Sequence, residues 1–124
     1  MSEIELAYEP REQFLPLHSR QQRWACLVVH RRGGKTVATI NEMIARASYT
    51  NKKNARYAYI APFYRQAKDV AWVYLKEFGG DAIVKIRESE LRVELFNGSW
   101  ITLYGADNPD ALRGLYLDGA VLDE

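Results

Sequence analysis

Two short groups of residues have types and spacings that suit the binding and hydrolysis of a nucleoside triphosphate. Gly34, Lys35 and Thr36 lie early in the sequence, and Asp123 and Glu124 are its last two residues. A glycine lets the backbone approach a phosphate closely, and the N–H groups at a helix start favour negative charge. The lysine can reach the β- and γ-phosphates, and the threonine hydroxyl can join the coordination shell of Mg²⁺.

The first group has the surroundings of a phosphate-binding loop. Residues 30–36 follow an apolar run over residues 25–29, and a helical pattern begins at Val37. The usual phosphate-loop pattern, G-x-x-x-x-G-K-[ST], is matched from Gly34 onward, but the position of its first glycine holds Val29. A strand, a basic glycine-containing turn and a helix are typical of the motif. A basic turn that caps an ordinary helix is the alternative.

The acidic pair has the position expected of a metal-binding acid and a general base. Asp123 and Glu124 follow the apolar run of residues 120–122. In phosphate-loop ATPases an aspartate after such a strand holds Mg²⁺, usually through water. The next acid can orient and deprotonate the attacking water. Adjacent acids after an apolar strand are common by chance, but they are much less common together with an upstream Gly-Lys-Thr turn.

The composition fits one globular domain and excludes few functions. The chain has 124 residues and a net charge of +1, so a nucleic-acid site would have to be a local basic patch. Its single cysteine, Cys26, cannot form a disulfide within the chain, which fits a reducing cytosol. No apolar run approaches the ~20 residues of a membrane span. The acidic start, residues 1–5, does not resemble a signal peptide.

The apolar pattern predicts an α/β fold with a mostly parallel sheet and an antiparallel hairpin. A strand over residues 55–61 is expected to pair in parallel with the strand that precedes the phosphate loop, with a helix over about residues 34–48 between them. Helical spacing predicts a second helix over residues 63–78. Alternating apolar residues predict an antiparallel insertion over residues 83–104, with Asn97-Gly98 as a turn.

Four segments of the chain resemble the N-terminal ATPase domain of the large terminase subunit of tailed bacteriophages, the motor that packages viral DNA. They are PREQF, HRRGGKT, YIAPFYRQA, and LRG through VLDE, at residues 10–14, 30–36, 59–67 and 112–124. The resemblance covers nearly the whole chain. Terminases also tolerate the absence of the first glycine and carry an arginine inside the phosphate loop, so Val29 and Arg31 agree with the family.

The resemblance implies which residues bind the nucleotide. Gln13 would contact adenine, although a surface glutamine is the simpler alternative and Gln21 and Gln22 are competing choices. Arg31 would sense or stabilise the γ-phosphate and take part in catalysis. The other nucleotide-binding positions would be Arg32, Gly33, Gly34, Lys35 and Thr36.

The resemblance also implies metal-binding and catalytic residues. Thr36 and Asp123 would coordinate Mg²⁺, and Glu124 would be the catalytic base. Arg113, in the Arg-Gly step before the last strand, would be a nucleotide-sensing or inter-subunit arginine. The expected cofactors are therefore ATP and Mg²⁺.

The fold implied by the resemblance is a P-loop NTPase-type three-layer fold that is incomplete at its C-terminus. Residues 1–124 would form one domain, with a lead-in over residues 1–24 that carries the adenine-side glutamine and a phosphate-loop core over residues 25–124. The sequence stops at the acidic pair and includes no nuclease domain. We therefore expect a fragment of a longer protein or a prophage remnant, which binds ATP weakly and hydrolyses it poorly alone.

In this family ATP hydrolysis drives double-stranded DNA into an empty procapsid. The implied partners are viral DNA, the portal protein, the small terminase subunit and other copies of the chain in a ring. The implied location is the cytoplasm of the bacterial host, with no membrane partner. Two alternatives stay open, namely a helicase-like phosphate-loop ATPase with a similar acidic pair, and a non-catalytic remnant that keeps the fold without turnover.

The assignment of Glu124 as the catalytic base predicts that Glu124→Gln abolishes hydrolysis without weakening nucleotide binding. The amide keeps the shape of the side chain but cannot accept a proton from water, so we expect the steady-state rate to fall by at least about 100-fold. Phosphate release and Mg-ATP affinity would be measured on the same preparations. A variant that hydrolyses ATP at the wild-type rate would refute this assignment.

Overall fold

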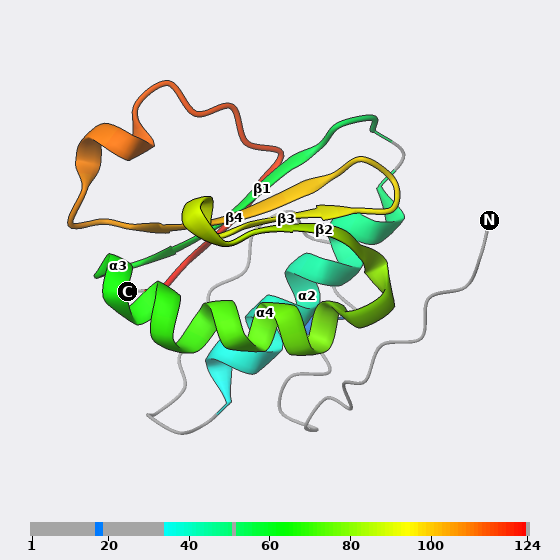
Figure 1. Cartoon of the computed structure of the whole chain (residues 1–124), viewed down its shortest axis with the longest axis horizontal. Helices are drawn as coiled ribbons and strands as arrows, with labels where there is room; N and C mark the ends of the chain where they lie inside the picture. Colours follow the sequence, from blue (N-terminus) through cyan, green and yellow to red (C-terminus); the bar gives the residue numbers. More distant parts are fainter. Residues whose placement is uncertain (1–16, 19–33, 51, 124) are drawn as a thin grey trace.

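The computed structural model describes residues 17–18, 34–50 and 52–123 of the chain (Figure 1). The described strands form one five-stranded sheet in the order β2-β3-β4-β1-β5. The expected strand over residues 25–29 lies outside the described residues. Its expected parallel pairing with the strand of residues 55–61 is wrong, because β4 and β5 occupy both edges of that strand. No helix in the described part of the chain is long and apolar enough to span a lipid bilayer.

The centre of the sheet is parallel and one side of it is antiparallel. β1 (Arg56–Ala61) pairs in parallel with β4 (Trp100–Gly105) on one side and with β5 (Gly119–Leu122) on the other. β3 (Arg92–Leu95) is antiparallel to β4 and to β2 (Ile83–Arg87). The predicted α/β class, with a parallel core and antiparallel strands, is thus confirmed.

The antiparallel segment over residues 83–104 belongs to the central sheet, because its last strand, β4, is also the parallel partner of β1. The turn before β4 is the predicted one, with Gly98 at φ 86° and its N–H bonded to the Leu95 carbonyl at 2.9 Å. The amide of Asn97 donates to the backbone oxygens of Ala47 and Ser48 at 2.8 and 3.2 Å. The hairpin turn therefore caps the end of the first long helix.

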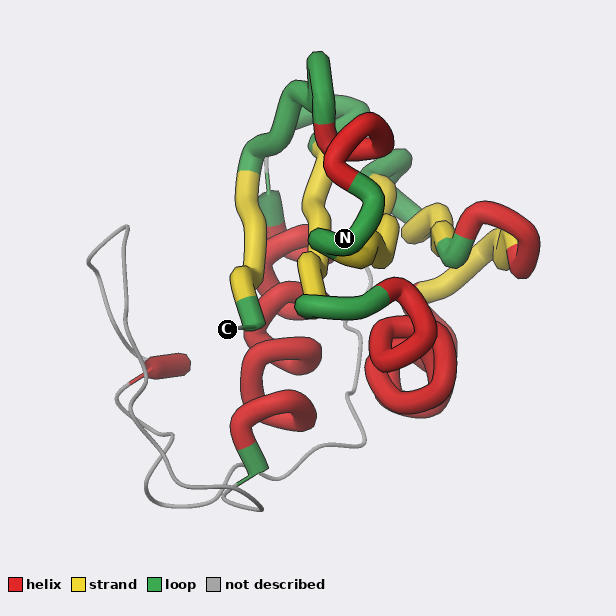
Figure 2. The backbone as a smooth tube through the Cα atoms, turned by 90° about the vertical axis from the view of Figure 1, so that its left-hand side faces the viewer, coloured by secondary structure: helices red, strands yellow, loops and turns green. Residues whose placement is uncertain are grey.

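The helices lie together on one face of the sheet (Figures 1 and 2). α2 (Lys35–Tyr49) begins within the tripeptide Gly34-Lys35-Thr36, close to the expected start of the helix. The second predicted helix is a continuous helical segment that begins with α3 (Tyr64–Gln66) and ends with α4 (Trp72–Gly79). Between them, residues Ala67–Ala71 form a π-helical turn. Such turns occur frequently near functional sites.

The core lies between the sheet and these helices because apolar residues alternate along the strands. Ile101 and Leu103 of β4 and Val93 and Leu95 of β3 face the helical layer, where they pack with apolar residues of α2 and α4. Residues at the alternate positions, such as Trp100 and Thr102, point to the opposite face, which residues 114–117 partly overlie. A three-layer fold was expected, with helices on both faces of the sheet. Among the described residues, helices cover one face of the sheet and a loop partly covers the other.

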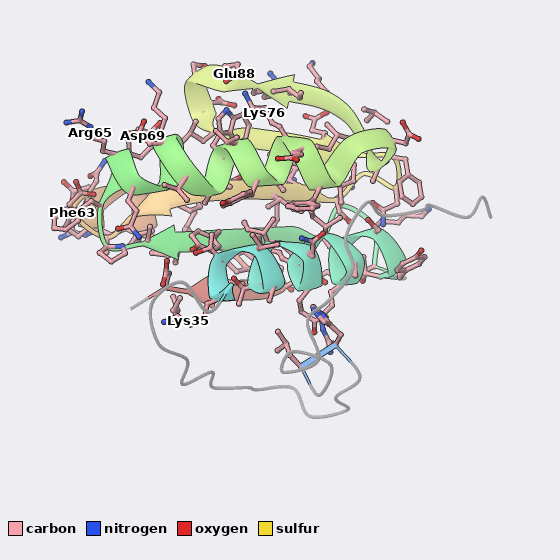
Figure 3. The ribbon with its side chains drawn as sticks, turned by 90° about the horizontal axis from the view of Figure 1, so that it is seen from below. Lys35, Phe63, Arg65, Asp69, Lys76 and Glu88 are labelled. Atoms are coloured by element: carbon pink, nitrogen blue, oxygen red, sulfur yellow. The ribbon has the colours of Figure 1, made fainter. Side chains whose placement is uncertain are left out.

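The ends of the parallel strands and the start of α2 lie at the same edge of the structure. Figure 3 shows Lys35 and Phe63 at this end, where β1 finishes. The carboxylate of Asp107 accepts a hydrogen bond from the Tyr64 N–H at 3.0 Å, at the beginning of α3. Gly105, the last residue of β4, is packed against the Tyr64 backbone. This edge is therefore held by contacts between segments that are distant in sequence.

The packing at Gly105 predicts that Gly105→Ala destabilises the fold. An added Cβ would lie 2.2 Å from the Tyr64 nitrogen and 2.3 Å from the Asp107 carboxylate. We expect the free energy of unfolding to fall by about 1–3 kcal/mol, as overpacking against backbone usually costs. Chemical denaturation would measure it, with Ala106→Ser at the exposed neighbouring residue as a control. Equal stability of both variants would contradict the close packing.

Candidate nucleotide site

Gly34 has the conformation that a phosphate loop needs at the start of its helix. Its φ and ψ are 87° and 17°, in the left-handed region that favours glycine. Its carbonyl accepts the first helical hydrogen bond, from the Ala38 N–H at 3.0 Å. The N-cap residue Gly34 has no side chain to cap α2, and the first turn of the helix contains no acidic residue. The positive end of the helix dipole is therefore suited to an anionic ligand.

Asp123 is placed beside this helix start by the register of β5. β5 pairs with β1 so that Val121 is opposite Tyr59, and both side chains pack on the helical face. Side chains two residues apart in an extended chain point to the same face. The Asp123 N–H continues the pairing through the Ile60 carbonyl at 2.9 Å. The Asp123 side chain is thus directed toward the face that α2 covers.

Tyr59 connects the two halves of the site. Its side chain is 2% exposed, and its hydroxyl donates a hydrogen bond to Oδ2 of Asp123 at 2.7 Å. Thr36 lies near enough to the Tyr59 phenol to lower its pKa. Residues 36, 59 and 123 are therefore neighbours, although they come from a helix, the central strand and the end of β5.

The surroundings of Tyr59 keep its phenol protonated. Burial is the main reason that its pKa is raised well above the ordinary value of 10.0. The hydrogen bond to Asp123 and the negative charge of that carboxylate act in the same direction, while the contact with Thr36 acts in the opposite one. Tyr59 is therefore a permanent hydrogen-bond donor to Asp123 at neutral pH.

The oxygen atoms at this point fit Mg²⁺ and do not form a complete metal cage. Thr36 supplies a hydroxyl and Asp123 a carboxylate, which are hard ligands of the kind that Mg²⁺ prefers. Within the described residues there is no group of three or more His, Cys, Asp or Glu side chains that could hold a metal. Mg²⁺ commonly has only one or two protein ligands and completes its shell with water and phosphate oxygens.

Several expected site residues are not joined to this cluster by the described contacts. Arg113 has a side chain that is 83% exposed, and it pairs with Asp110 at 3.6 Å. Its role as a sensor or inter-subunit arginine stays a prediction. The other assigned residues lie outside the described part of the chain, namely Gln13, Arg31, Arg32, Gly33 and Glu124.

Sequence reasoning gave no role to Tyr59. It lies in an expected strand and in one of the segments that resemble terminases, but a buried tyrosine in a strand is usually interpreted as core. The available signal was the alternation of Tyr59, Val121 and Asp123 on one face, which requires the register of β1 and β5. That register is a tertiary property and could not be obtained from either strand alone.

Comparisons with known proteins point to one kind of domain. No family model matches the chain, and no curated protein sequence matches it. Among solved structures, the chain is similar to the large terminase ATPase domain of Thermus phage P74-26, with a TM-score of 0.76 and 26% sequence identity over 96% of this chain. An arginine-to-alanine mutant of the same domain gives a TM-score of 0.72 and 25% identity.

The resemblance to the ATPase domain of a phage large terminase, first indicated by four sequence segments, is therefore confirmed by the fold. The chain spans 55% of the length of the solved terminase chains. The similarity extends over almost all of the present chain.

The buried bond between Tyr59 and Asp123 predicts a pH-dependent effect of Tyr59→Phe. Loss of a hydrogen bond to a charged group should lower the free energy of unfolding by about 1.5–3 kcal/mol at neutral pH. Because the folded pKa is raised, the contribution of Tyr59 is complete below its ordinary pKa of 10.0 and is lost as the pH rises above it.

Denaturation curves measured from neutral pH to above pH 10 would therefore show the wild-type protein losing more stability than the Tyr59→Phe variant. The control is Tyr64→Phe, which removes a hydroxyl from a side chain that is 39% exposed. Parallel pH profiles for the wild type and Tyr59→Phe would show that the phenol is not held in this way.

Proposed function

We propose that this chain is the ATP-binding and ATP-hydrolysing part of a viral DNA-packaging motor. The observation that carries the proposal is the Tyr59–Asp123 hydrogen bond close to Thr36, near the start of α2. Two distant parts of the sequence supply a hydroxyl and a carboxylate at the place where a phosphate chain and its metal would bind. The similarity to a solved terminase ATPase domain supports the same function.

The nucleotide-binding step follows from the residues at the helix start. Lys35 and the N–H groups of the first turn of α2 bind the β- and γ-phosphates of ATP. Thr36 and Asp123 would hold Mg²⁺, which would supply positive charge to offset the negative charge on the transferring phosphoryl group. Tyr59 keeps the Asp123 carboxylate in one orientation, because it donates a hydrogen bond to Oδ2 of that carboxylate.

In the hydrolysis step a water molecule attacks the γ-phosphorus while the bond to the β–γ bridging oxygen breaks, giving ADP and inorganic phosphate. Glu124, next to Asp123 in the chain, orients this water and accepts its proton. Arg31 stabilises the charge on the γ-phosphate, and Gln13 contacts the adenine edge. Arg32 and Gly33 complete the phosphate loop before Gly34.

The motor requires partners beyond this chain. Hydrolysis drives translocation of double-stranded DNA into the procapsid, with the portal protein and the small terminase subunit as further components. Copies of the chain act as a ring in the cytoplasm of the bacterial host. The exposure of Arg113, at 83%, suits an arginine that reaches the nucleotide of a neighbouring copy. The similarity to a phage terminase domain favours this role over a helicase-like ATPase.

A titration with Mg-ATP tests the proposed site through Lys35→Ala. Removal of a charge-assisted phosphate contact should weaken binding by at least about tenfold. The matched control is Lys53→Ala, which removes the same charge from an exposed loop position. Isothermal calorimetry would give both affinities, and melting curves would show whether each variant is folded. Identical affinities in the two variants would exclude a functional phosphate loop.

A further inference from the structure

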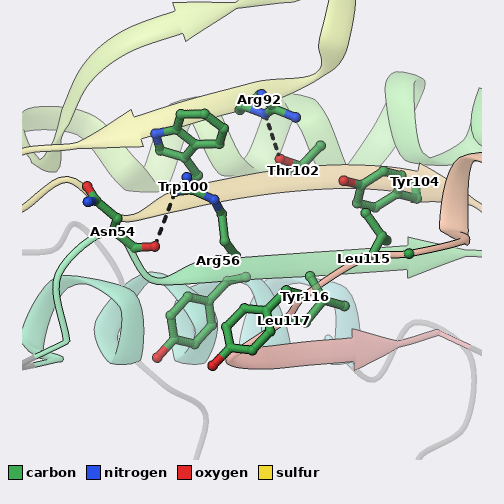
Figure 4. A pocket seen from close by; sticks show the side chains of 11 residues that line it. Asn54, Arg56, Arg92, Trp100, Thr102, Tyr104, Leu115, Tyr116 and Leu117 are labelled. Carbon is green, nitrogen blue, oxygen red and sulfur yellow. Dashed lines mark hydrogen bonds between the residues drawn. The ribbon is translucent and has the colours of Figure 1, made fainter.

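A groove lies on the sheet face that the helices do not cover (Figure 4). It has a volume of about 340 Å³ and is walled by β1, β3 and β4 on one side and by the loop before β5 on the other. The side chains that form its floor are Arg56, Arg92, Trp100, Thr102 and Tyr104. The groove belongs to a different face from the Tyr59–Asp123 cluster, because its strand residues alternate with those of the core.

Two arginines share one aromatic ring in this groove. The guanidinium carbon of Arg56 is 3.6 Å from the centre of the Trp100 ring, and that of Arg92 is 4.4 Å from it. The parallel pairing of Arg56 with Trp100 and the antiparallel pairing of β3 with β4 bring the three residues together. Cation–π contacts of this kind hold a guanidinium in a fixed orientation.

Each guanidinium is anchored by only part of its donor set. Arg92 donates from Nε to the Thr102 hydroxyl at 3.0 Å, and Arg56 donates from Nη1 to the Asn54 carbonyl at 3.2 Å. A guanidinium has five N–H donors arranged in a planar fork, which matches the oxygens of a phosphate. The two arginines are therefore positioned by the protein and keep further donors for a ligand.

The charge inside the groove is positive. Among the described residues that line it there are two arginines and no carboxylate. The acids near it lie at its margin. Glu90 pairs with Nη1 of the groove residue Arg92 at 3.7 Å, and Glu94 pairs with Arg87 at 3.3 Å. Asp118 pairs with Lys52. This local basic patch contrasts with the net charge of +1 for the whole chain.

We infer that the groove binds the phosphodiester backbone of duplex DNA, with Arg56 and Arg92 contacting a phosphate and Trp100 holding both guanidiniums in place. Since both arginines contact the Trp100 ring, that ring positions cations and is not a free platform for an unpaired base. Most contacts between proteins and DNA are made to phosphates, and arginine is a common donor. The inference rests on the proposed function only for the choice of DNA as the polymer.

The groove is continuous with the segment that positions the metal-binding acid. The wall formed by residues 114–117 lies in the loop between Arg113 and β5, and β5 leads directly to Asp123. Gly114 in this loop has a φ of 71°, a conformation that glycine adopts readily. A DNA backbone bound in the groove therefore contacts the same loop that carries Arg113 and precedes the acid.

The test measures the binding of a short fluorescein-labelled DNA duplex by anisotropy, from about 50 to 200 mM salt. Arg56→Gln and Arg92→Gln each remove one groove cation. The matched control, Arg65→Gln, removes one cation from an α3 side chain that is 92% exposed. Each groove variant should bind at least about fivefold more weakly than the control, and its salt dependence should be shallower by about 0.9 per lost phosphate contact.

Further variants separate charge from packing. Arg92→Lys retains the cation and should keep the wild-type salt dependence, while Trp100→Phe should weaken duplex binding because the arginines lose part of their support. Melting curves establish that each variant is folded. Groove variants that bind the duplex as tightly as Arg65→Gln would overturn the inference. It would also be overturned if inorganic phosphate, at the concentration of the DNA phosphates, displaced the duplex, because the groove would then be a site for a free anion.

The failure of this inference can be distinguished from the failure of the proposed function. The groove variants should bind Mg-ATP with wild-type affinity, and Lys35→Ala should bind the duplex normally. Unchanged ATP binding in Lys35→Ala together with weakened duplex binding in the groove variants would refute the phosphate loop alone. The converse pattern, with ATP binding lost in Lys35→Ala and duplex binding intact in the groove variants, would refute the groove alone.

Discussion

The structure depends on the two-sided parallel pairing of β1. β4 and β5 hydrogen-bond to opposite edges of this strand, and no described strand except β1 joins them. Parallel pairing places the carboxyl ends of the three strands at one edge of the sheet, where side chains from distant segments can meet. The start of α2 lies at this edge as well (Figure 3). Without β1 in this position, Thr36 and Asp123 would have no common neighbour.

Side chains alternate along β1, so its two faces contribute to two different sites. Tyr59 points toward the helices and connects Thr36 with Asp123. Arg56, three residues earlier, points to the open face and stacks on Trp100. β1 therefore contributes to the proposed nucleotide site and to the basic groove. The loop before β5 borders the groove, and β5 then leads to Asp123. This arrangement offers a short physical route between the proposed DNA-binding groove and the proposed nucleotide site.

Much of the fold could be predicted because its signals are local. The spacing of apolar residues located α2 and the helical segment from α3 to α4, and Asn97-Gly98 identified the turn before β4. Pairing partners could not be predicted in the same way. The apolar pattern of β4 fitted a hairpin strand equally well, and its parallel pairing with β1 depends on contacts between segments more than forty residues apart. The one-sided helical layer likewise follows from which face of each strand is apolar.

The sequence by itself determined the chemistry of the candidate site. Gly34, Lys35 and Thr36 have the residue types expected of a phosphate-binding tripeptide, and the acidic pair has those expected of a metal ligand and a base, since these properties belong to the side chains. Tertiary structure alone decided that Tyr59 donates to Asp123 close to Thr36, and that Arg56 and Arg92 share the Trp100 ring. Both sets of contacts depend on the register of neighbouring strands. That register is set by packing of the whole sheet against its helices and is not encoded in any single segment.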